Sequence, residues 1–266
     1  MPLDDRWPVS KSRRMLLSWS IPSRLMMFAG SVFSKIWLGW LNRVKLYNVE
    51  VFHDAVDKRD PKRGLLTVCN HYSCMDDPLV WGMMKWRHVI NAKKVRWSTA
   101  AADICFTNRL NSLFFSLGQT IPICRGHGVY QKSMDYVIEE LNTGGFVHIF
   151  PEGKVNMDKR CTRLKWGVGR IIADCKIPPI VLPIYHIGMD DILPNSTPYI
   201  PRIRKNVTIL VGKPMEFGSE LEMLQKLKKN QKEIRKHITD IIQEELRILK
   251  EKAEQLHRTH FGLNEP

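Results

Sequence analysis

The chain has 266 residues, 44% of them hydrophobic, which is enough apolar material for one large domain or two small ones. Its formal net charge of +14 predicts an anionic partner: an acidic membrane surface, a phosphorylated substrate or a nucleic acid. The six cysteines form no CxxC pair and no zinc-like spacing, which disfavours a metal site and a disulfide framework and favours reduced, mostly buried thiols.

Residues 15–41 form an apolar segment rich in Leu, Met, Phe and Trp. Its longest uncharged run covers residues 25–34, whereas a bilayer-spanning helix needs about 20 residues, so a transmembrane helix is disfavoured. Pro22 is expected to start a helix here or to separate two helices. Bulky apolar side chains share one face of this helix, opposite small and polar ones: Val32, Phe33, Ile36, Trp37 and Trp40 against Ser31, Ser34, Lys35 and Asn42. This pattern is typical of a helix lying in a membrane interface, although an amphipathic helix packed on a domain shows it too.

Beyond residue 45, strand-like and helix-like segments alternate along the chain. Apolar runs predict strands at 64–70, 95–100, 120–124, 145–150, 180–186 and 206–212. Amphipathic stretches between them predict helices at 78–85, 111–116, 129–142 and 165–175. The alternation predicts an α/β domain whose mixed, largely parallel sheet is flanked by helices.

The C-terminal tail reads as one long charged helix over residues 219–255, docked on the domain by a partial apolar stripe. A coiled-coil partner site is the alternative. Three parts are therefore expected: a membrane-associating segment (1–45), an α/β domain (46–218) and the C-terminal helix (219–266).

A basic cluster with interleaved tryptophans lies between residues 85 and 97. Its members are Lys85, Trp86, Arg87, Lys93, Lys94, Arg96 and Trp97. Such a cluster suits a phospholipid headgroup layer and single-stranded nucleic acid equally well.

A polar stretch follows the first of these strands and places His71 and Asp76 five residues apart. On one continuous helix their side chains would point about 140° apart, so they meet only at a strand–turn–helix corner. There the carboxylate could hold the imidazole in the orientation that a general base needs. Asp77 before Pro78 predicts that Asp77 caps the next helix, which leaves Asp76 free to face His71. An ordinary turn has the same spacing, and Cys74 between the two is a less favoured candidate nucleophile.

Two further strand ends carry residues suited to a phosphorylated polyol. Arg125 follows one strand within a glycine turn, where a guanidinium could grip a phosphate, or could simply lie on the surface. Glu152 and Gly153 follow a buried strand, where a carboxylate could bind hydroxyls and glycine admits close approach. Lys154 adds positive charge for a phosphate, although Pro-Glu-Gly is also an ordinary turn.

Two strand histidines, His148 and His186, are expected to be packed in the core or to cap a neighbour rather than to act as ligands. The chain has no Gly-x-Ser-x-Gly elbow, no P-loop and no dinucleotide-binding fingerprint. Neither a metal nor a cofactor is therefore expected.

Four motifs follow one another between residues 70 and 184: Asn-His-x4-Asp, Ile-Pro-x-x-Arg-Gly, Phe-Pro-Glu-Gly and Val-Leu-Pro-Ile. This ordered set resembles the glycerolipid acyltransferase family and implies a single domain of that family's fold. Two further stretches narrow the resemblance to one branch of that family: the sequence around His71 and the run Arg-Leu-Lys-Trp-Gly-Val-Gly-Arg at 163–170. They are similar to the branch that takes acyl chains from phospholipids instead of acyl-CoA and remodels cardiolipin in mitochondria.

The resemblance implies that His71 removes the proton of a lysophospholipid hydroxyl and that Asp76 supports the imidazolium. It also implies that Arg125, Glu152 and Gly153 bind the glycerol-phosphate part. Expected partners are cardiolipin, monolysocardiolipin, phosphatidylcholine and a mitochondrial membrane facing the intermembrane space, with no nucleic acid; an oligomer is left open. Two alternatives remain: a CoA-dependent lysophospholipid acyltransferase using the same residues, and a basic lipid- or nucleic-acid-binding module in which His71 is only structural.

Overall fold

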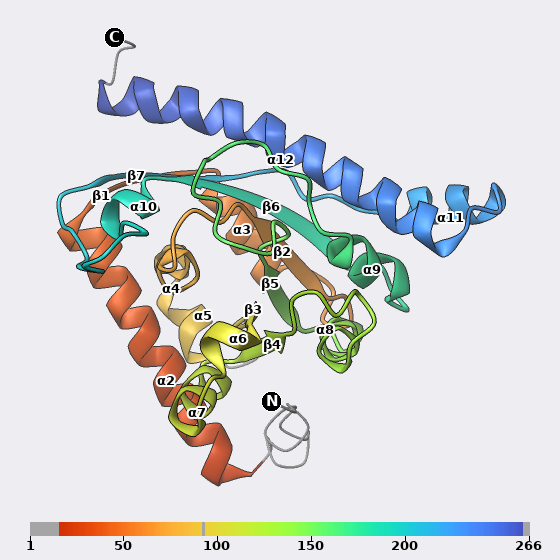
Figure 1. Cartoon of the computed structure of the whole chain (residues 1–266), viewed down its shortest axis with the longest axis horizontal. Helices are drawn as coiled ribbons and strands as arrows, with labels where there is room; N and C mark the ends of the chain where they lie inside the picture. The colour runs from red at the N-terminus through yellow and green to blue at the C-terminus, as the bar shows by residue number, and fades with distance from the viewer. Residues whose placement is uncertain (1–15, 92–93, 263–266) are drawn as a thin grey trace.

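The computed structural model describes residues 16–91 and 94–262 (Figure 1). Within these ranges one seven-stranded sheet has the order β1-β7-β6-β2-β5-β3-β4. The strands are β1 (Arg43–Tyr47), β2 (Leu65–Cys69), β3 (Trp97–Ala101), β4 (Thr120–Ile123), β5 (Phe146–Ile149), β6 (Ile180–Ile187) and β7 (Asn206–Val211). Neighbours are parallel except β6 and β7, so β1 and β7 run against the other five. The predicted α/β fold with a mixed, largely parallel sheet is confirmed.

Helices cover both faces of this sheet. They are α2 (Leu17–Ile36), α3 (Val49–Asp57), α4 (Asp76–Val80), α5 (Trp86–Ile90), α6 (Ala102–Cys105), α7 (Arg109–Leu117), α8 (Lys132–Asn142), α9 (Gly167–Asp174), α10 (Met189–Ile192), α11 (Gly218–Lys226) and α12 (Gln231–Phe261). Two further helical segments are a short π-helix, η2 (Trp37–Leu41), which follows α2, and a 3-10 helix, η3 (Trp81–Met83), which follows α4. One buried cluster joins the sheet to α8, α9, α11 and α12, and a second joins it to α3, α4, η3 and α10. The domain therefore has three layers, with the sheet between two layers of helices.

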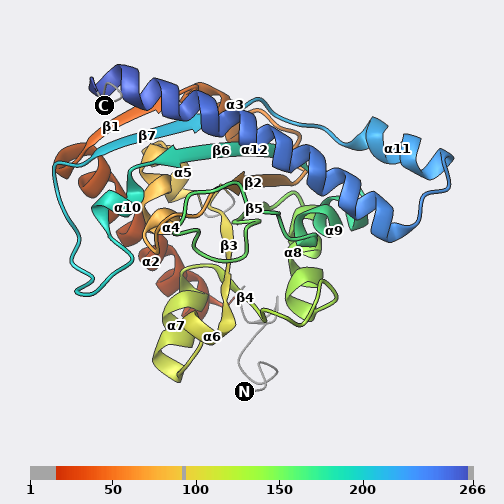
Figure 2. The same cartoon turned by 45° about the horizontal axis from the view of Figure 1, so that its top comes forward.

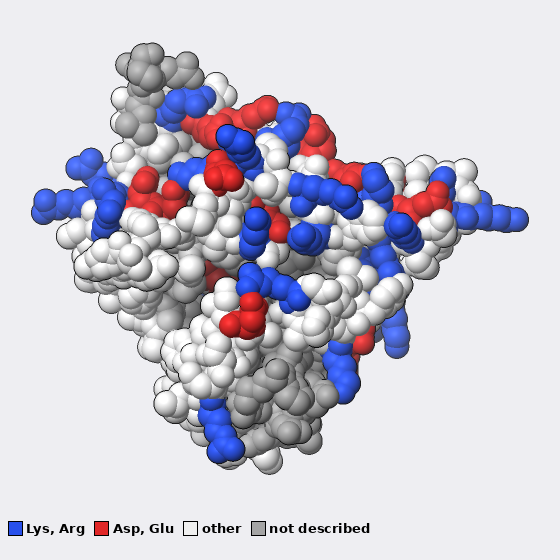
Figure 3. All heavy atoms as spheres, viewed as in Figure 1, with Lys and Arg blue, Asp and Glu red and all other residues white. Residues whose placement is uncertain are grey.

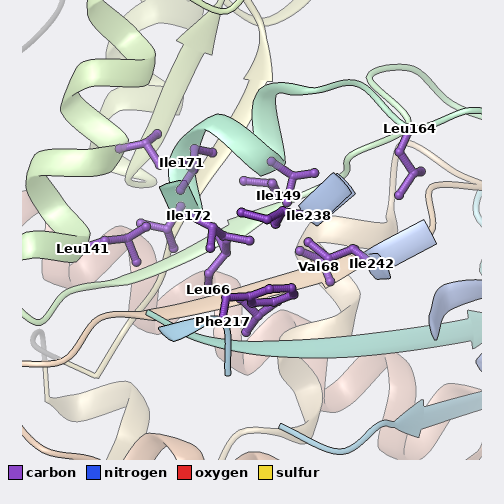
Figure 4. Close-up of a cluster of buried hydrophobic side chains, with 14 of the residues drawn as sticks. Leu66, Val68, Leu141, Ile149, Leu164, Ile171, Ile172, Phe217, Ile238 and Ile242 are labelled. Carbon is purple, nitrogen blue, oxygen red and sulfur yellow. The ribbon is translucent and has the colours of Figure 1, made fainter. Parts of the chain in front are cut away.

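Strand β2 lies in the middle of the sheet and contributes to both clusters. Leu66 and Val68 belong to the first cluster, and Figure 4 shows them among side chains of α9 and α12. Leu65 and Cys69 belong to the second cluster, as the two-residue period of a strand requires. Because helices cover both of its faces, this strand reads as a continuous apolar run. Its rigidity fixes the start of the loop that carries His71.

All six predicted strands are present, with ends shifted by up to two residues. The missed strand, β1, is a short edge strand paired only with β7 among the described strands. Val44 and Leu46 pack on the core while the exposed Arg43 breaks the apolar pattern, so the strand gives a weak signal in the sequence. The expected boundary between residues 45 and 46 falls inside β1.

The predicted long C-terminal helix is confirmed as α12, but its extent over residues 219–255 is wrong, because the tail forms two helices. Helix α11 ends at Lys226, and Asn230 starts α12 with a capping box that includes Glu233. Helix α12 runs along β6, β7 and α9, and its apolar stripe is part of the core (Figure 2). Residues 263–266 lie outside the described part.

Helix α2 contains Pro22 in its second turn, so the expectation that this proline starts or splits the helix is wrong. The helix lies against α4, α5, α7 and η3. In the described residues no helix combines the length and apolar character needed to cross a membrane.

Candidate active site

The predicted pair of His71 and Asp76 meets at the end of β2. His71 Nδ1 lies 2.9 Å from Asp76 Oδ2. Strand β2 is followed by a short loop and then by α4, which begins at Asp76, so the chain turns the corner that this contact requires. Strand β5 pairs with β2 in parallel, so its carboxyl end brings Glu152 to the same edge of the sheet.

Asp76 is completely buried, and its Oδ2 atom accepts several hydrogen bonds. The backbone N–H groups of Tyr72 and Ser73 donate to Oδ2 at 2.6 and 2.8 Å, beside the bond from His71. Burial raises the pKa of Asp76, but the charges and hydrogen bonds of His186 and His71 outweigh it and hold the pKa at about 2. Asp76 is therefore a fixed anion that can orient and stabilise an imidazolium.

The ring and the backbone of His71 are both held by neighbouring residues, while the Nε2 atom of the ring is left open. Its ring stacks on Phe150, with ring centroids 4.1 Å apart and planes 15° apart. Glu152 Oε1 accepts the His71 backbone N–H at 2.9 Å, and the Asn156 N–H donates to the His71 carbonyl at 2.7 Å. Within the described part of the chain, Nε2 has no hydrogen-bond partner. With Nδ1 protonated toward Asp76, Nε2 can accept a proton from a substrate.

Glu152 supports the His71 loop, a contact that the sequence did not predict. One carboxylate oxygen binds His71, and the other is 3.4 Å from the Thr162 hydroxyl. Burial raises the pKa of Glu152. Gly153 has a φ of +74°, which explains a glycine there, and both Gly153 and Lys154 are exposed in the following turn.

Arg125 lies after β4, away from the pair of His71 and Asp76. Its exposed guanidinium is paired with Asp103 in α6, with Nε 3.2 Å from Oδ1. Three strand spacings separate β2 from β4, which corresponds to about 14 Å. The two strands are parallel, so Arg125 and His71 share one edge of the sheet without touching.

Asp77 is not the cap of α4, so that prediction is wrong. The helix begins at Asp76, and no side chain caps it. Asp77 instead accepts hydrogen bonds from the Trp81 indole and the Ser98 hydroxyl and forms an ion pair with the buried Arg96. Most of these partners come from β3 or just before it, so Asp77 joins α4 to the sheet.

The basic cluster at residues 85–97 does not form one free cationic patch. Besides Arg96, which pairs with Asp77, both Arg87 and Lys94 pair with the single carboxylate of Asp57, which offsets one of their two positive charges. Trp97 is part of the core, and Lys93 lies outside the described residues. Arg96 and Trp97 of this cluster therefore stabilise the fold.

All six cysteines are free, as predicted, but only Cys69 and Cys175 are buried. Cys74 is exposed, and partial burial of its thiol raises the pKa, which disfavours the thiolate. His148 and His186 are both fully buried, in agreement with their expected packing.

Comparisons with known proteins agree with this fold and show the family to which the chain belongs. A sequence model of the family described as "Acyltransferase" matches residues 43–187. The "Tafazzin" of Drosophila melanogaster is 46% identical over 97% of this chain and 68% of its own length. The "Taffazin" of Dictyostelium discoideum is 39% identical over 68% of this chain and 65% of its own. An "N-acylphosphatidylethanolamine synthase" of Arabidopsis thaliana is 38% identical over 74% of this chain and 72% of its own.

Among solved structures, the 1-acyl-sn-glycerophosphate acyltransferase PlsC of Thermotoga maritima has a similar fold. Its TM-score is 0.59 at 17% sequence identity, covering 89% of this chain and 84% of that one. The chain belongs to the acyltransferase family and is therefore an acyltransferase. Within the family its relatives include the tafazzins of fruit fly, slime mould and yeast. The alternative of a non-enzymatic binding module is therefore wrong.

Proposed function

We propose that the chain is a membrane-associated transacylase that moves an acyl chain from a phospholipid to a lysophospholipid, with His71 as general base. The observation that supports this most directly is the geometry of His71, whose Nδ1 is held by the buried anion Asp76 while Nε2 is open. A general base needs this combination of a fixed tautomer and a free lone pair.

The reaction exchanges one ester for another. His71 Nε2 takes the proton from the lysophospholipid hydroxyl as the hydroxyl oxygen bonds to the acyl carbonyl carbon of the donor. The tetrahedral intermediate then releases the donor's glycerol oxygen, which receives the proton back from His71. Asp76 stabilises the imidazolium between these steps. No water and no cofactor is consumed, and the similar bond energies of the two esters make the transfer reversible.

The same edge of the sheet supplies the groups that we assign to the glycerol-phosphate part. Arg125 can exchange its exposed partner Asp103 for a phosphate, which a guanidinium binds with two parallel hydrogen bonds. Glu152, Gly153 and Lys154 follow β5, and Glu152 contacts the His71 backbone. A headgroup lying along this edge would reach Arg125 while its hydroxyl meets His71.

Helix α2 supports membrane association because its polar face is turned inward. Ser23 Oγ donates to the Leu117 carbonyl at 2.8 Å, and Ser34 Oγ donates to the Pro78 carbonyl. The bulky apolar side chains of α2 are left exposed, and so is one in the following η2: Leu17, Ile21, Leu25, Phe28, Phe33 and Ile36 in α2, and Trp40 in η2. This is the opposite of an ordinary surface helix and fits insertion into the interface of a bilayer.

Neighbouring helices extend this surface. In α6 and α7, which follows α6 and contacts α2, the exposed apolar residues are Ile104, Leu110, Leu113 and Phe114. Figure 3 shows the region over α2 largely free of charged side chains, while Lys, Arg, Asp and Glu gather over α12. The two regions suit a membrane and bulk water respectively.

For the acceptor and its location, we propose monolysocardiolipin in a mitochondrial membrane facing the intermembrane space, with phosphatidylcholine as donor. The motif resemblance and the tafazzin relatives support this choice. The net charge of +14 suits a doubly anionic lipid.

The test is transfer of a labelled acyl chain from phosphatidylcholine to monolysocardiolipin in vesicles without CoA, using wild type and His71→Ala. We expect transfer by wild type and its loss in the variant. A requirement for acyl-CoA would favour the CoA-dependent alternative. Undiminished transfer by His71→Ala would exclude His71 as the base.

A parallel assay offers phosphatidylethanolamine as acceptor, because the Arabidopsis relative is named for acylation of that lipid. The product would then be an amide, which resists mild alkali, whereas the ester product is cleaved. An amide in place of an ester would overturn the proposed acceptor.

A further inference from the structure

His186 lies near the end of β6, directly beside the end of β2, and its side chain is completely buried. The side chain of Asn70 binds its backbone twice: Nδ2 donates to the His186 carbonyl at 3.0 Å, and the His186 N–H donates to Oδ1 at 2.9 Å. These bonds continue the pairing of β2 and β6 beyond Cys69. The imidazole is therefore held in place by the same turn that carries His71.

The His186 ring reaches the carboxylate behind His71. Its Nε2 atom is 3.1 Å from the Asn70 carbonyl oxygen and 3.4 Å from Asp76 Oδ2. Oδ2 is also the atom that binds His71 Nδ1 at 2.9 Å. One buried carboxylate oxygen thus lies between two imidazoles, of which only His71 is open to a substrate.

We propose that His186 is a positioning residue: a buried imidazolium that keeps Asp76 anionic and in place and thereby limits how strongly His71 holds a proton. This inference rests on the proposed function, in which His71 is the base. A lone buried anion beside His71 would stabilise the imidazolium strongly and so make release of the proton to the leaving group harder. A second cation on the same carboxylate opposes this and eases that release.

The carboxylate of Asp76 favours a charged His186 ring, whereas the buried Nδ1 atom of that ring has no hydrogen-bond partner among the described residues. Burial lowers the pKa of His186, but the negative charge of Asp76 outweighs it, and the pKa lies well above the usual histidine value. The other titratable groups that act on it are Cys69, whose thiol also raises this pKa, and the carboxyl of Glu152, on which His186 acts in turn. His148 is also coupled to it, but burial lowers the pKa of His148 to about 3, so that ring is neutral.

The test compares pH profiles of kcat/KM for wild type, His186→Gln and the matched control His148→Gln. Glutamine keeps an N–H near the position of Nε2 but removes the charge. We expect the acidic limb of the His186→Gln profile to move up by about one pH unit, with activity largely recovered at high pH. We expect the limb of His148→Gln to stay in place, because a neutral ring is replaced.

A folded His186→Gln protein with the wild-type limb would overturn the inference, as would an equal shift in His148→Gln. Where His186→Gln fails to fold, nitrogen-15 histidine NMR of His71→Ala at pH 8 decides instead. We expect one of the remaining histidines to stay doubly protonated, and the absence of such a ring overturns the inference. Activity of His71→Ala separately tests the proposed function, so the two failures are distinguishable.

Discussion

Two adjacent carboxylates, Asp76 and Asp77, should respond to the same substitution in opposite ways. Asp76→Asn is expected to remove activity with a moderate loss of stability, whereas Asp77→Asn should lose stability with little loss of kcat per folded molecule. The reason lies in their partners. Asp76 contacts His71, while Asp77 contacts the buried Arg96 and the Ser98 hydroxyl.

The activity loss of Asp76→Asn follows from charge. The N–H groups of Tyr72 and Ser73 donate to Oδ2, so the asparagine should place its oxygen there and keep the bond to His71. What is lost is the attraction between carboxylate and imidazolium, about 4 kcal/mol at about 4 Å for an effective dielectric constant of about 20. This corresponds to a kcat about 10³-fold lower.

Asp76→Asn and Asp77→Asn also lower the free energy of unfolding by different amounts. The pKa of Asp76 is about 2 against a usual 3.8, which corresponds to about 2 kcal/mol of stability at neutral pH. Asp77→Asn leaves the guanidinium of Arg96 buried without its anion, at a cost of about 3 kcal/mol, or about 6–12 °C in Tm.

The assay measures kcat of acyl transfer and Tm on the same preparations, well below the Tm of each variant. We expect kcat of folded Asp77→Asn within about tenfold of wild type. A folded Asp77→Asn protein that loses as much kcat as Asp76→Asn would refute the assignment of the two carboxylates.

Three further predictions follow from the site and the surface. Because the folded pKa of Asp76 is depressed, its stabilisation is present above about pH 4 and is lost as the pH falls toward 2, so urea midpoints of wild type and Asp76→Asn should converge over that window. Glu152→Gln keeps an oxygen for the His71 N–H and removes a carboxyl whose raised pKa disfavours folding at neutral pH, so its Tm should equal or exceed that of wild type. Glu152→Ala should lose about 1–3 kcal/mol of stability. Equal Tm values for Glu152→Ala and Glu152→Gln would contradict the contact between Glu152 and the His71 backbone. Phe28→Ser with Phe33→Ser should reduce flotation with anionic vesicles, whereas Ile248→Ser on α12 should not; equal flotation would exclude α2 as a membrane contact.

The sequence predicted those features that depend on local order. The spacing predicted that His71 and Asp76 could meet if a strand–turn–helix corner lay between them, and the order of the four motifs favoured that arrangement over an ordinary turn. Asp77 was assigned to the wrong role because an Asp-Pro pair looks like a helix start, while its true partners, Arg96 and Ser98, are 19 and 21 residues away along the chain.

Features that depend on the order of strands in the sheet could not be predicted from the sequence. Strand β6 lies beside β2 although more than a hundred residues separate them, and only this pairing brings His186 to Asp76. The bond from Glu152 to the His71 backbone likewise depends on the pairing of β2 and β5. Periodicity reveals which face of a strand is apolar, but it does not reveal which strand lies next to it.

The inward-facing serines of α2 have a consequence for how the enzyme meets its lipids. Ser34 is bonded to the carbonyl of Pro78, in the same short helix that begins with Asp76. In the proposed membrane-bound state, the anchoring helix is therefore bonded directly to the helix that follows the reacting histidine, which ties the height of His71 above the bilayer to the depth of α2. A lipid must bring its hydroxyl or ester up to that height, so the looseness of lipid packing would help to decide which molecules react.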